Sequence, residues 1–252
     1  MKRESTVTHW EKHWSWKEKQ ELTFINEKLI HQIFFLYEDI KDVKILEVGA
    51  GTGRDSIYLA KLGADVTCLD YSSTSLKLIK EKAGGGNIKL IEATVEEMPF
   101  KDESFDIVFS QGLVEHFKNP YKMMHEQVRI LKKDGCIIVD VPAKYHPFVI
   151  VKHILIWLNK WFAGWETEYN VNEIKELFER FGIEYQSSYP RGYFPYGFEV
   201  LYEYKCRITN KIKSLLPEAL ILNFGKLGNW IESHQFVYYF CMNIGVIGKK
   251  RE

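Results

Sequence analysis

A regular alternation of short apolar segments with helical segments, between Val43 and Val141, constrains the fold more than any other feature. Five apolar runs predict buried strands, and they cover residues 43–48, 65–69, 88–91, 105–109 and 136–141. Helical segments are predicted between them, over residues 55–62, 72–83 and 120–131. Parallel neighbours need a crossover connection, so the alternation predicts a doubly wound α/β sheet with helices on both faces.

A glycine-rich loop, "LEVGAGTGRD" (Leu46 to Asp55), joins the first of these strands to the helix that follows it. Such loops hold nucleoside triphosphates, nicotinamide dinucleotides or S-adenosylmethionine. A triphosphate loop ends in Gly-Lys-Ser or Gly-Lys-Thr, which is absent here. The dinucleotide fingerprint requires its third glycine where Arg54 stands, whereas this loop has Gly53 one position earlier.

Two carboxylates near the loop narrow the choice of ligand. Asp70 follows the second predicted strand, about 20 residues after the loop begins, where an acidic residue accepts hydrogen bonds from ribose hydroxyls. This position is shared by dinucleotide and S-adenosylmethionine sites. Glu47 stands beside the loop, where it would repel a pyrophosphate but suits a ligand that carries an ammonium and a sulfonium. The pair therefore favours S-adenosylmethionine over NAD.

The segments between Val43 and Pro142 resemble those of a known protein family. The segment "ILEVGAGTGRDSIYLAKLGADVTCLDYS" resembles the first two motifs of class I S-adenosylmethionine-dependent methyltransferases, and "EEMPFKDESFDIVFSQGLVEHFKNP" resembles the third and fourth motifs of their small-molecule branch, the type 11-like methyltransferases. "ILKKDGCIIVDVP" is similar to the helix, turn and fifth strand that follow. The resemblance runs from Val43 to Pro142. It implies a Rossmann-like, mostly parallel sheet of seven strands whose last strand is antiparallel.

The resemblance also implies roles for particular residues. The glycine loop would pass under the methionine and ribose parts of the cofactor, Asp70 would hold the ribose, and Tyr71 would lie against the adenine. Thr94 stands where the family usually has an acidic residue that accepts from the adenine amino group, which is a departure. The full set of implied cofactor residues is Glu47, Gly49, Gly51, Gly53, Asp70, Tyr71, Thr94, Val95, Gln111 and Gly112.

Methyl transfer from a sulfonium is an in-line displacement, and alignment and exclusion of water supply much of its catalysis. An alcohol, phenol or acidic carbon must also lose a proton. His116 is the candidate general base because its pKa suits neutral pH, and the alternative is a histidine that only shapes the site. The candidate acceptor-binding residues are Trp14, Glu115, Tyr145, Trp165 and Tyr193.

The chain is expected to form a single domain over residues 1–252. Its parts are a helical lead or lid at 1–40, the cofactor-binding core at 43–142, a helical insertion at 145–170, and sheet and substrate-side segments at 171–252. A helix is predicted over 172–181, followed by two further strands, one from Ile183 and one over 236–247. The final pair fits an antiparallel seventh strand inserted beside the sixth.

The insertion contains an apolar segment over 148–162, with Lys152 and Asn159 on one narrow strip of a predicted helix. Three interpretations stay open: a core helix, a wall of a pocket for a hydrophobic substrate, or a helix that lies on a membrane surface. The later stretch "SSYPRGYFPYGFE" could clamp a ring or form a packed edge. Its aromatic and basic residues are Tyr189, Arg191, Tyr193, Phe194, Tyr196 and Phe198.

Composition excludes several classes of protein. Lys plus Arg equals Asp plus Glu, 34 each, so no nucleic-acid partner is expected. The four cysteines are widely spaced, which predicts buried free thiols and no metal site or disulfide framework. The charged beginning and the lack of a long apolar run predict neither a signal peptide nor a transmembrane helix, hence a cytoplasmic protein. The oligomeric state is left open.

The predicted function is S-adenosylmethionine-dependent methylation of a small, apolar or aromatic molecule. Two alternatives remain: a methyltransferase-like domain that binds without catalysis or serves as a partner subunit, and a nicotinamide-dependent oxidoreductase, which Arg54 and Glu47 disfavour.

Overall fold

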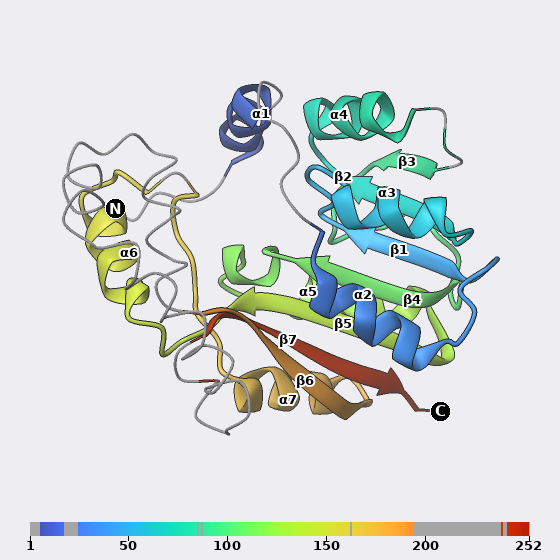
Figure 1. The fold of residues 1–252 in the computed structure, drawn as a ribbon. Coiled ribbons are helices and arrows are strands. Elements are labelled where there is room, and N and C mark those ends of the chain that lie inside the picture. Colours follow the sequence, from blue (N-terminus) through green and yellow to red (C-terminus); the bar gives the residue numbers. More distant parts are fainter. Residues whose placement is uncertain are drawn as a thin grey trace, which may run out of the picture.

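The computed structural model describes residues 6–17, 25–84, 86, 88–161, 163–193, 238 and 241–251. Seven strands form one sheet in the order β3-β2-β1-β4-β5-β7-β6 (Figure 1). They are β1 (Lys44–Val48), β2 (Asp65–Asp70), β3 (Ile88–Glu92), β4 (Phe105–Gln111), β5 (Leu131–Pro142), β6 (Ile183–Tyr193) and β7 (Cys241–Lys250). β7 lies between β5 and β6 and runs antiparallel to both, which confirms the predicted mixed sheet.

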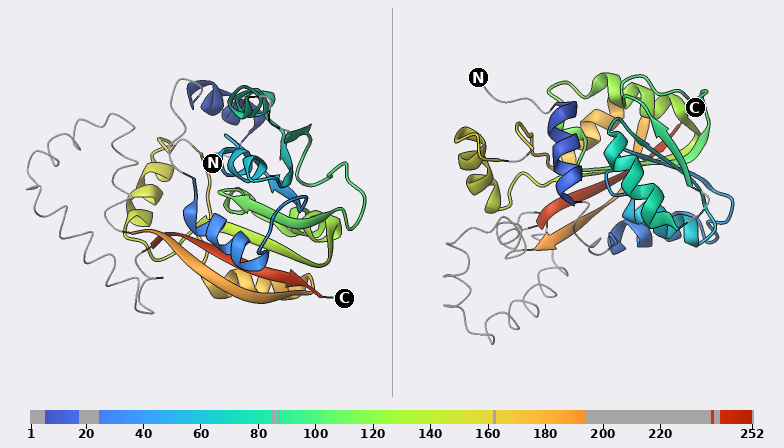
Figure 2. Two further views of the ribbon diagram at one scale, coloured as in Figure 1. Left: turned by 45° about the vertical axis from the view of Figure 1, so that its right-hand side comes forward. Right: turned by 90° about the horizontal axis from the view of Figure 1, so that it is seen from above.

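Helices cover both faces of the sheet, as the alternation predicts (Figure 2). The helical elements are α1 (Val7–Lys17), α2 (Glu27–Leu36), α3 (Arg54–Lys61), α4 (Ser73–Ala83), η1 (Val114–His116), α5 (Tyr121–Ile130), α6 (Phe148–Trp157) and α7 (Val171–Arg180). Apolar residues of α2, α3 and α4 pack in one core cluster, and those of α5 and α7 pack in another. Each layer of helices therefore buries its own face of the sheet.

Local signals explain several boundaries. Ser72 accepts a hydrogen bond from Ser75 N–H and caps α4, which ends at Gly84 in the left-handed region. Asn170 and Glu173 form a reciprocal capping box at the start of α7. These short-range bonds depend only on neighbouring residues, and sequence therefore located both helices to within two residues.

The helix of the insertion is shorter than predicted. α6 ends at Trp157, because Asn159 takes a left-handed conformation (φ 56°) and Lys160 N–H turns back to the carbonyl of Leu155 at 2.8 Å. The prediction that Lys152 and Asn159 lie on one strip of the same helix is therefore wrong, because Asn159 lies beyond the end of α6. The expected lead over 1–40 is two helices, α1 and α2, and the last strand begins at Cys241; Phe236 lies outside the described residues.

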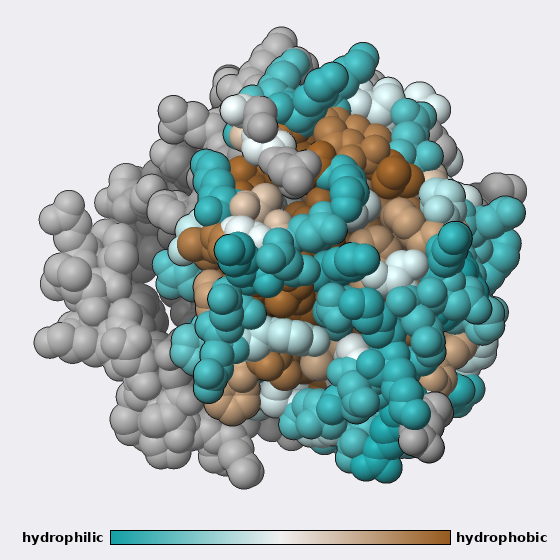
Figure 3. Space-filling model, turned by 90° about the vertical axis from the view of Figure 1, so that its right-hand side faces the viewer, coloured by the Kyte–Doolittle hydropathy of each residue, from teal (hydrophilic) through white to brown (hydrophobic). Residues whose placement is uncertain are grey.

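The parallel strands all end at one edge of the sheet, toward α1 and α6 (Figure 1). The opposite side of the molecule carries mostly hydrophilic side chains with smaller apolar areas between them (Figure 3). Ligands of open α/β sheets bind at the carboxyl ends of the strands, so a binding site is expected at the edge next to α1 and α6.

Candidate cofactor and acceptor site

The glycine loop turns from β1 into α3 with three left-handed glycines, at φ 69° for Gly49, 55° for Gly51 and 59° for Gly53. Main-chain N–H of Gly49 donates to the carbonyl of Leu69 at 2.8 Å, which fixes the loop against β2. A Cβ on Gly51 would lie 2.8 Å from the ring of Trp14 in α1. Only glycine satisfies both the backbone angle and this close approach.

Asp70 is buried at the carboxyl end of β2, beside the loop. Its Oδ2 accepts from Gly51 N–H at 2.8 Å and its Oδ1 accepts from Ser72 N–H at 2.9 Å. Burial raises the pKa of Asp70, and these main-chain hydrogen bonds act in the opposite direction. Each carboxylate oxygen has a second lone pair, so Asp70 can brace the loop and still accept from ribose hydroxyls.

Glu47 is buried at the end of β1 and accepts a hydrogen bond from Ser56 Oγ at 2.5 Å. Burial, together with the negative charge of Asp55, raises the pKa of Glu47 to about 8. A cation brought near Glu47 would favour its charged form. The role of Glu47 toward an ammonium group stays a prediction.

A cavity of about 400 Å³ opens beside Asp70. Tyr71, Thr94 and Val95, all predicted from the family resemblance, line it, and so do Leu113 and Phe117, which were not predicted. Thr94 Oγ1 accepts a hydrogen bond from Glu96 N–H at 3.4 Å, which stabilises the turn after β3. The mixture of a carboxylate with flat and apolar walls fits a nucleoside.

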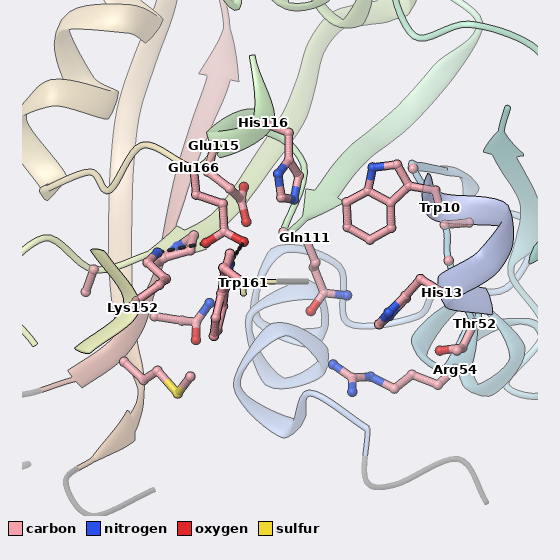
Figure 4. Close-up of a pocket in the computed structure, with 18 of the residues that line it drawn as sticks. Trp10, His13, Thr52, Arg54, Gln111, Glu115, His116, Lys152, Trp161 and Glu166 are labelled. Carbon is pink, nitrogen blue, oxygen red and sulfur yellow. Dashed lines mark hydrogen bonds and ion pairs between the residues drawn. The ribbon is translucent and has the colours of Figure 1, made fainter. Parts of the chain in front are cut away.

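A second cavity of about 340 Å³ shares several of its walls with the first. The shared residues are Trp10, Trp14, Gly49, Gly112 and His116. Beyond them, the second cavity is lined by the predicted residues Glu47, Gln111 and Glu115, and by side chains of the insertion (Figure 4). Gly49 of the glycine loop thus lines both of two adjoining cavities.

Glu115 and His116 both belong to η1, which follows β4, and both are drawn in the second cavity in Figure 4. Glu115 Oε2 and His116 Nδ1 are buried and have no hydrogen-bond partner among the described residues. Burial and the charge of Glu166 raise the pKa of Glu115 well above its ordinary value, whereas burial lowers the pKa of His116. A buried neutral imidazole beside a cavity can accept a proton.

The insertion contributes a buried ion pair to this cavity. Lys152 Nζ lies 2.8 Å from Glu166 Oε2 and 2.6 Å from Glu168 Oε1, and Trp161 Nε1 donates to Glu166 Oε1 at 2.7 Å. Although burial would lower the pKa of Lys152, the two carboxylates raise it above its ordinary value. Sequence did not predict this cluster, because Glu166 and Glu168 lie outside the helix that carries Lys152.

α6 therefore turns its charged side chain inward and apolar side chains outward. Lys152 is 4% exposed and Phe148 is buried, whereas Trp157 is 83% exposed. Ile150, Ile154 and Leu158 are also exposed. Because Phe148 and Lys152 line the second cavity, this placement agrees with the pocket-wall interpretation for one face of the helix.

Of the predicted acceptor residues, Trp14 and Glu115 line the cavity, while Tyr145 is half-exposed and Tyr145 and Trp165 line neither described cavity. The side chain of Tyr193 lies outside the described residues. So do Phe194, Tyr196 and Phe198 of the aromatic stretch.

The described part of that stretch forms a packed edge. Tyr189 is buried and donates to Asp140 Oδ2 at 3.2 Å, and Arg191 pairs with Asp140 Oδ1 at 2.8 Å. Asn26, at the start of α2, donates to both Asp140 and Gln111. This network below the cavity was missed, although a carboxylate inside the apolar run 136–141 was a signal that Asp140 needs a buried partner.

The fold, the glycine loop and the two adjoining cavities have the architecture of the Rossmann-like methyltransferase fold. Residues 46–139 match the family model described as a methyltransferase domain. Over these residues the chain is similar to methyltransferase domains.

Two curated relatives illustrate the similarity. The chain is 29% identical over 145 residues to a 2-methyl-6-phytyl-1,4-hydroquinone methyltransferase from Oryza sativa, which covers 56% of this chain and 41% of the relative. It is 28% identical over 163 residues to a ubiquinone biosynthesis O-methyltransferase from Rickettsia bellii, covering 62% of this chain and 68% of the relative. The matched part thus spans about two fifths and two thirds of these proteins.

Solved structures share the fold at low identity. The magnesium protoporphyrin IX methyltransferase from Synechocystis, solved with S-adenosylhomocysteine, superimposes with a TM-score of 0.60 at 12% identity, over 94% of this chain and 93% of that one. The cyclase SpnF superimposes with a TM-score of 0.61 at 14% identity, over 93% of this chain and 85% of the SpnF chain. The second case shows that this fold also occurs in a protein named for another reaction.

Proposed function

We propose that this protein transfers a methyl group from S-adenosylmethionine to a hydroxyl group of a small apolar or aromatic molecule. The observation that carries the proposal is the pair of adjoining cavities. Asp70 lies in one, Glu115 lies in the other, and Gly49, Gly112 and His116 line both. A nucleoside in the first cavity would present its reactive end to a second molecule in the other.

The residues present fit the cofactor. The left-handed glycines leave room for a ligand, Asp70 has lone pairs for ribose hydroxyls, and Glu47 can balance an ammonium. Tyr71, Thr94 and Val95 would hold the adenine, and Gln111 and Gly112 would lie at the methionine end. S-adenosylmethionine supplies an activated methyl group that needs no further activation.

The second cavity suits a flat or apolar acceptor. Trp10, Phe148 and Trp161 give it apolar walls that exclude water, while Glu115 and His116 are the polar groups at the shared end. Holding the acceptor in line with the methyl group is the main contribution that these walls make to the rate. The methylated atom would be the one that faces His116.

His116 is proposed to remove the proton of the acceptor hydroxyl. Its lowered pKa keeps the imidazole neutral near pH 7, which is the form that accepts a proton. Replacing His116 with Ala should lower kcat about 100-fold with S-adenosylmethionine affinity retained, within the range that general bases contribute. Unchanged turnover would remove His116 as a base.

Calorimetric titration with S-adenosylmethionine, S-adenosylhomocysteine and NAD tests the proposal. Both adenosyl ligands should bind, and Asp70→Asn should weaken them by about 10- to 100-fold, the loss expected for hydrogen bonds to a charged group. Asp65→Asn is the matched control, because Asp65 lies at the other end of the same strand and pairs with exposed Lys89. Binding of NAD alone would contradict the proposal.

A second candidate function is binding without methyl transfer, which the shared fold of the cyclase SpnF supports. The two candidates differ in one readout. A methyltransferase converts S-adenosylmethionine to S-adenosylhomocysteine when a hydroxyl acceptor is supplied, whereas a binding subunit returns it unchanged.

The outward face of α6 supports a further part of the proposal, contact with a lipid surface. Ile150, Ile154, Trp157 and Leu158 are exposed at helical spacing. None of the described helices is long and apolar enough to span a bilayer. In a flotation experiment the protein should rise together with phospholipid vesicles. The double variant Trp157→Ser/Ile154→Ser should no longer rise with them. Absence of binding by the unaltered protein would discard the contact.

A further inference from the structure

His146, between β5 and α6, is a histidine of the second cavity with no role in the mechanism above. It is 2% exposed and lines that cavity. Main-chain N–H of Phe148 donates to its Nδ1 at 3.1 Å. Nδ1 therefore keeps its lone pair, and a neutral imidazole must then carry its single hydrogen on Nε2.

This Nε2–H group is a donor without an acceptor. Nε2 is buried and has no hydrogen-bond partner among the described residues. Burial also lowers the pKa of His146, which keeps the ring neutral and preserves this tautomer. Buried donors are seldom left unpaired in native proteins, so a ligand atom is the natural partner.

The same cavity contains an unpartnered group of the opposite kind. His116 Nδ1 has no partner among the described residues, and it lies in η1, on a different element from His146. His116 can thus accept a hydrogen bond from a ligand hydroxyl, and His146 can donate a hydrogen bond to a second ligand atom. A ligand that satisfies both histidines needs two oxygen functions.

The charged residues that line the cavity indicate whether the ligand oxygen bound by His146 is anionic or uncharged. Glu115 and Glu166 line it, and Lys152 is already paired with Glu166 and Glu168. An anionic group beside these carboxyl groups would meet their charge, and Arg54, a further cation that lines the cavity, already pairs with Asp55. An uncharged oxygen avoids that cost.

We propose that His146 Nε2–H donates a hydrogen bond to an uncharged carbonyl or ether oxygen of the acceptor, separate from the hydroxyl that is methylated. This inference rests on the proposed function and makes His146 a specificity-determining residue. The protein would select hydroxy compounds that carry a second oxygen over equal-sized compounds that lack it.

The test compares two probes on protein saturated with S-adenosylhomocysteine. The first is 4-hydroxyacetophenone, which has a hydroxyl and a carbonyl; the second is 4-ethylphenol, which has the hydroxyl alone. Affinities are measured by NMR titration with ¹⁵N-labelled histidine. The carbonyl probe should bind about three- to tenfold more tightly, as expected for one neutral hydrogen bond. It should also shift the Nε2–H resonance of His146.

Two variants identify the donor. His146→Leu should remove the preference between the probes, and His146→Gln should keep most of it, because its side-chain amide N–H reaches a similar place. Both should bind S-adenosylhomocysteine as the unaltered protein does, which shows that they fold. Equal affinity for the two probes, no binding of 4-hydroxyacetophenone, or a preference that survives in His146→Leu would each overturn the inference.

The outcome separates this inference from the function on which it rests. Failure of the unaltered protein to bind S-adenosylhomocysteine would contradict the proposed function. A protein that binds S-adenosylhomocysteine but does not distinguish the two probes would contradict only the role of His146.

Discussion

Glu47 lies at the end of β1 with its carboxyl group held by Ser56, and its pKa of about 8 means that it carries a proton at neutral pH when no ligand is bound. A positively charged methionine group would favour the carboxylate. Binding of S-adenosylmethionine should then release a proton from Glu47.

The sign of the pH dependence follows from this release. Below the pKa, binding must first remove the proton, so affinity for S-adenosylmethionine should rise with pH up to about pH 8, near which the α-amino group of the ligand itself loses its charge. The gain between pH 6 and pH 7 should be about tenfold. Calorimetry across this range measures it, and Glu47→Gln should flatten the profile. A flat profile in the unaltered protein would show that Glu47 does not sense the ligand.

Residues that belong to a continuous motif were predictable from sequence. Glu47, Gly51 and Asp70 stand at fixed spacings around two strands, and the structure brings them together because adjacent parallel strands end at one edge. His146 and Lys152 were not predicted as site residues. Their positions depend on how the insertion folds back over the sheet, which local spacing does not determine.

At the scale of single elements, β7 is fitted closely to β6. Gly245 lies opposite Tyr189 in the antiparallel ladder, and a Cβ on Gly245 would come within 2.0 Å of the Tyr189 ring. Gly245→Ala should lower the free energy of unfolding by about 2 kcal/mol, as overpacking does. Urea denaturation measures the loss. Gly86→Ala is the control, since its Cβ would meet only the carbonyl of Ala83 at 3.2 Å; an equal loss in both variants would contradict this explanation.

α6 depends on charges outside itself. Lys152→Met would leave Glu166 and Glu168 buried beside each other without their cation, so it should lower the free energy of unfolding by about 3 kcal/mol. Lys160→Met, on an exposed side chain just beyond the helix, should change it by less than about 0.5 kcal/mol. Chemical denaturation at pH 7 compares the two. Equal stabilities would mean that the buried pair contributes nothing.

The same helix shows where elements resist prediction. Its apolar composition indicated a long helix, but Asn159 ends it early, and Glu166 and Glu168 pull Lys152 inward. Helices with their own caps, such as α4 and α7, were predicted well because the deciding contacts are local.

At the scale of the whole molecule, the sheet was the most predictable feature. The alternation of strands and helices between Val43 and Val141 determines crossover connections, and these determine the parallel order. The antiparallel β7 was expected only from the family resemblance. The placement of α1 and α6 over the carboxyl edge follows from packing between distant segments, and so sequence left several interpretations open.

α1 contributes walls to both cavities and also contacts α4. Trp10 packs edge-on against His116 with ring centroids 5.0 Å apart, Trp14 lies against Gly51, and Glu11 accepts a hydrogen bond from Thr74 of α4. Glu11→Ala removes the last contact without touching either cavity wall. It should speed dissociation of S-adenosylhomocysteine about fivefold, because the hydrogen bonds of Glu11 to Ser72 and Ser73 at the start of α4 are also lost. Stopped-flow tryptophan fluorescence measures the rate, and an unchanged rate would show that α1 does not retain the ligand.

The position of Trp14 above the glycine loop has a consequence for the order of events in turnover. S-adenosylhomocysteine bound as proposed would lie beneath Trp14, which would have to move before the spent cofactor could exchange, whereas the methylated product would leave through the neighbouring cavity. Product departure and cofactor exchange are then separate steps, and when the second is slower the enzyme shows a burst in its first turnover.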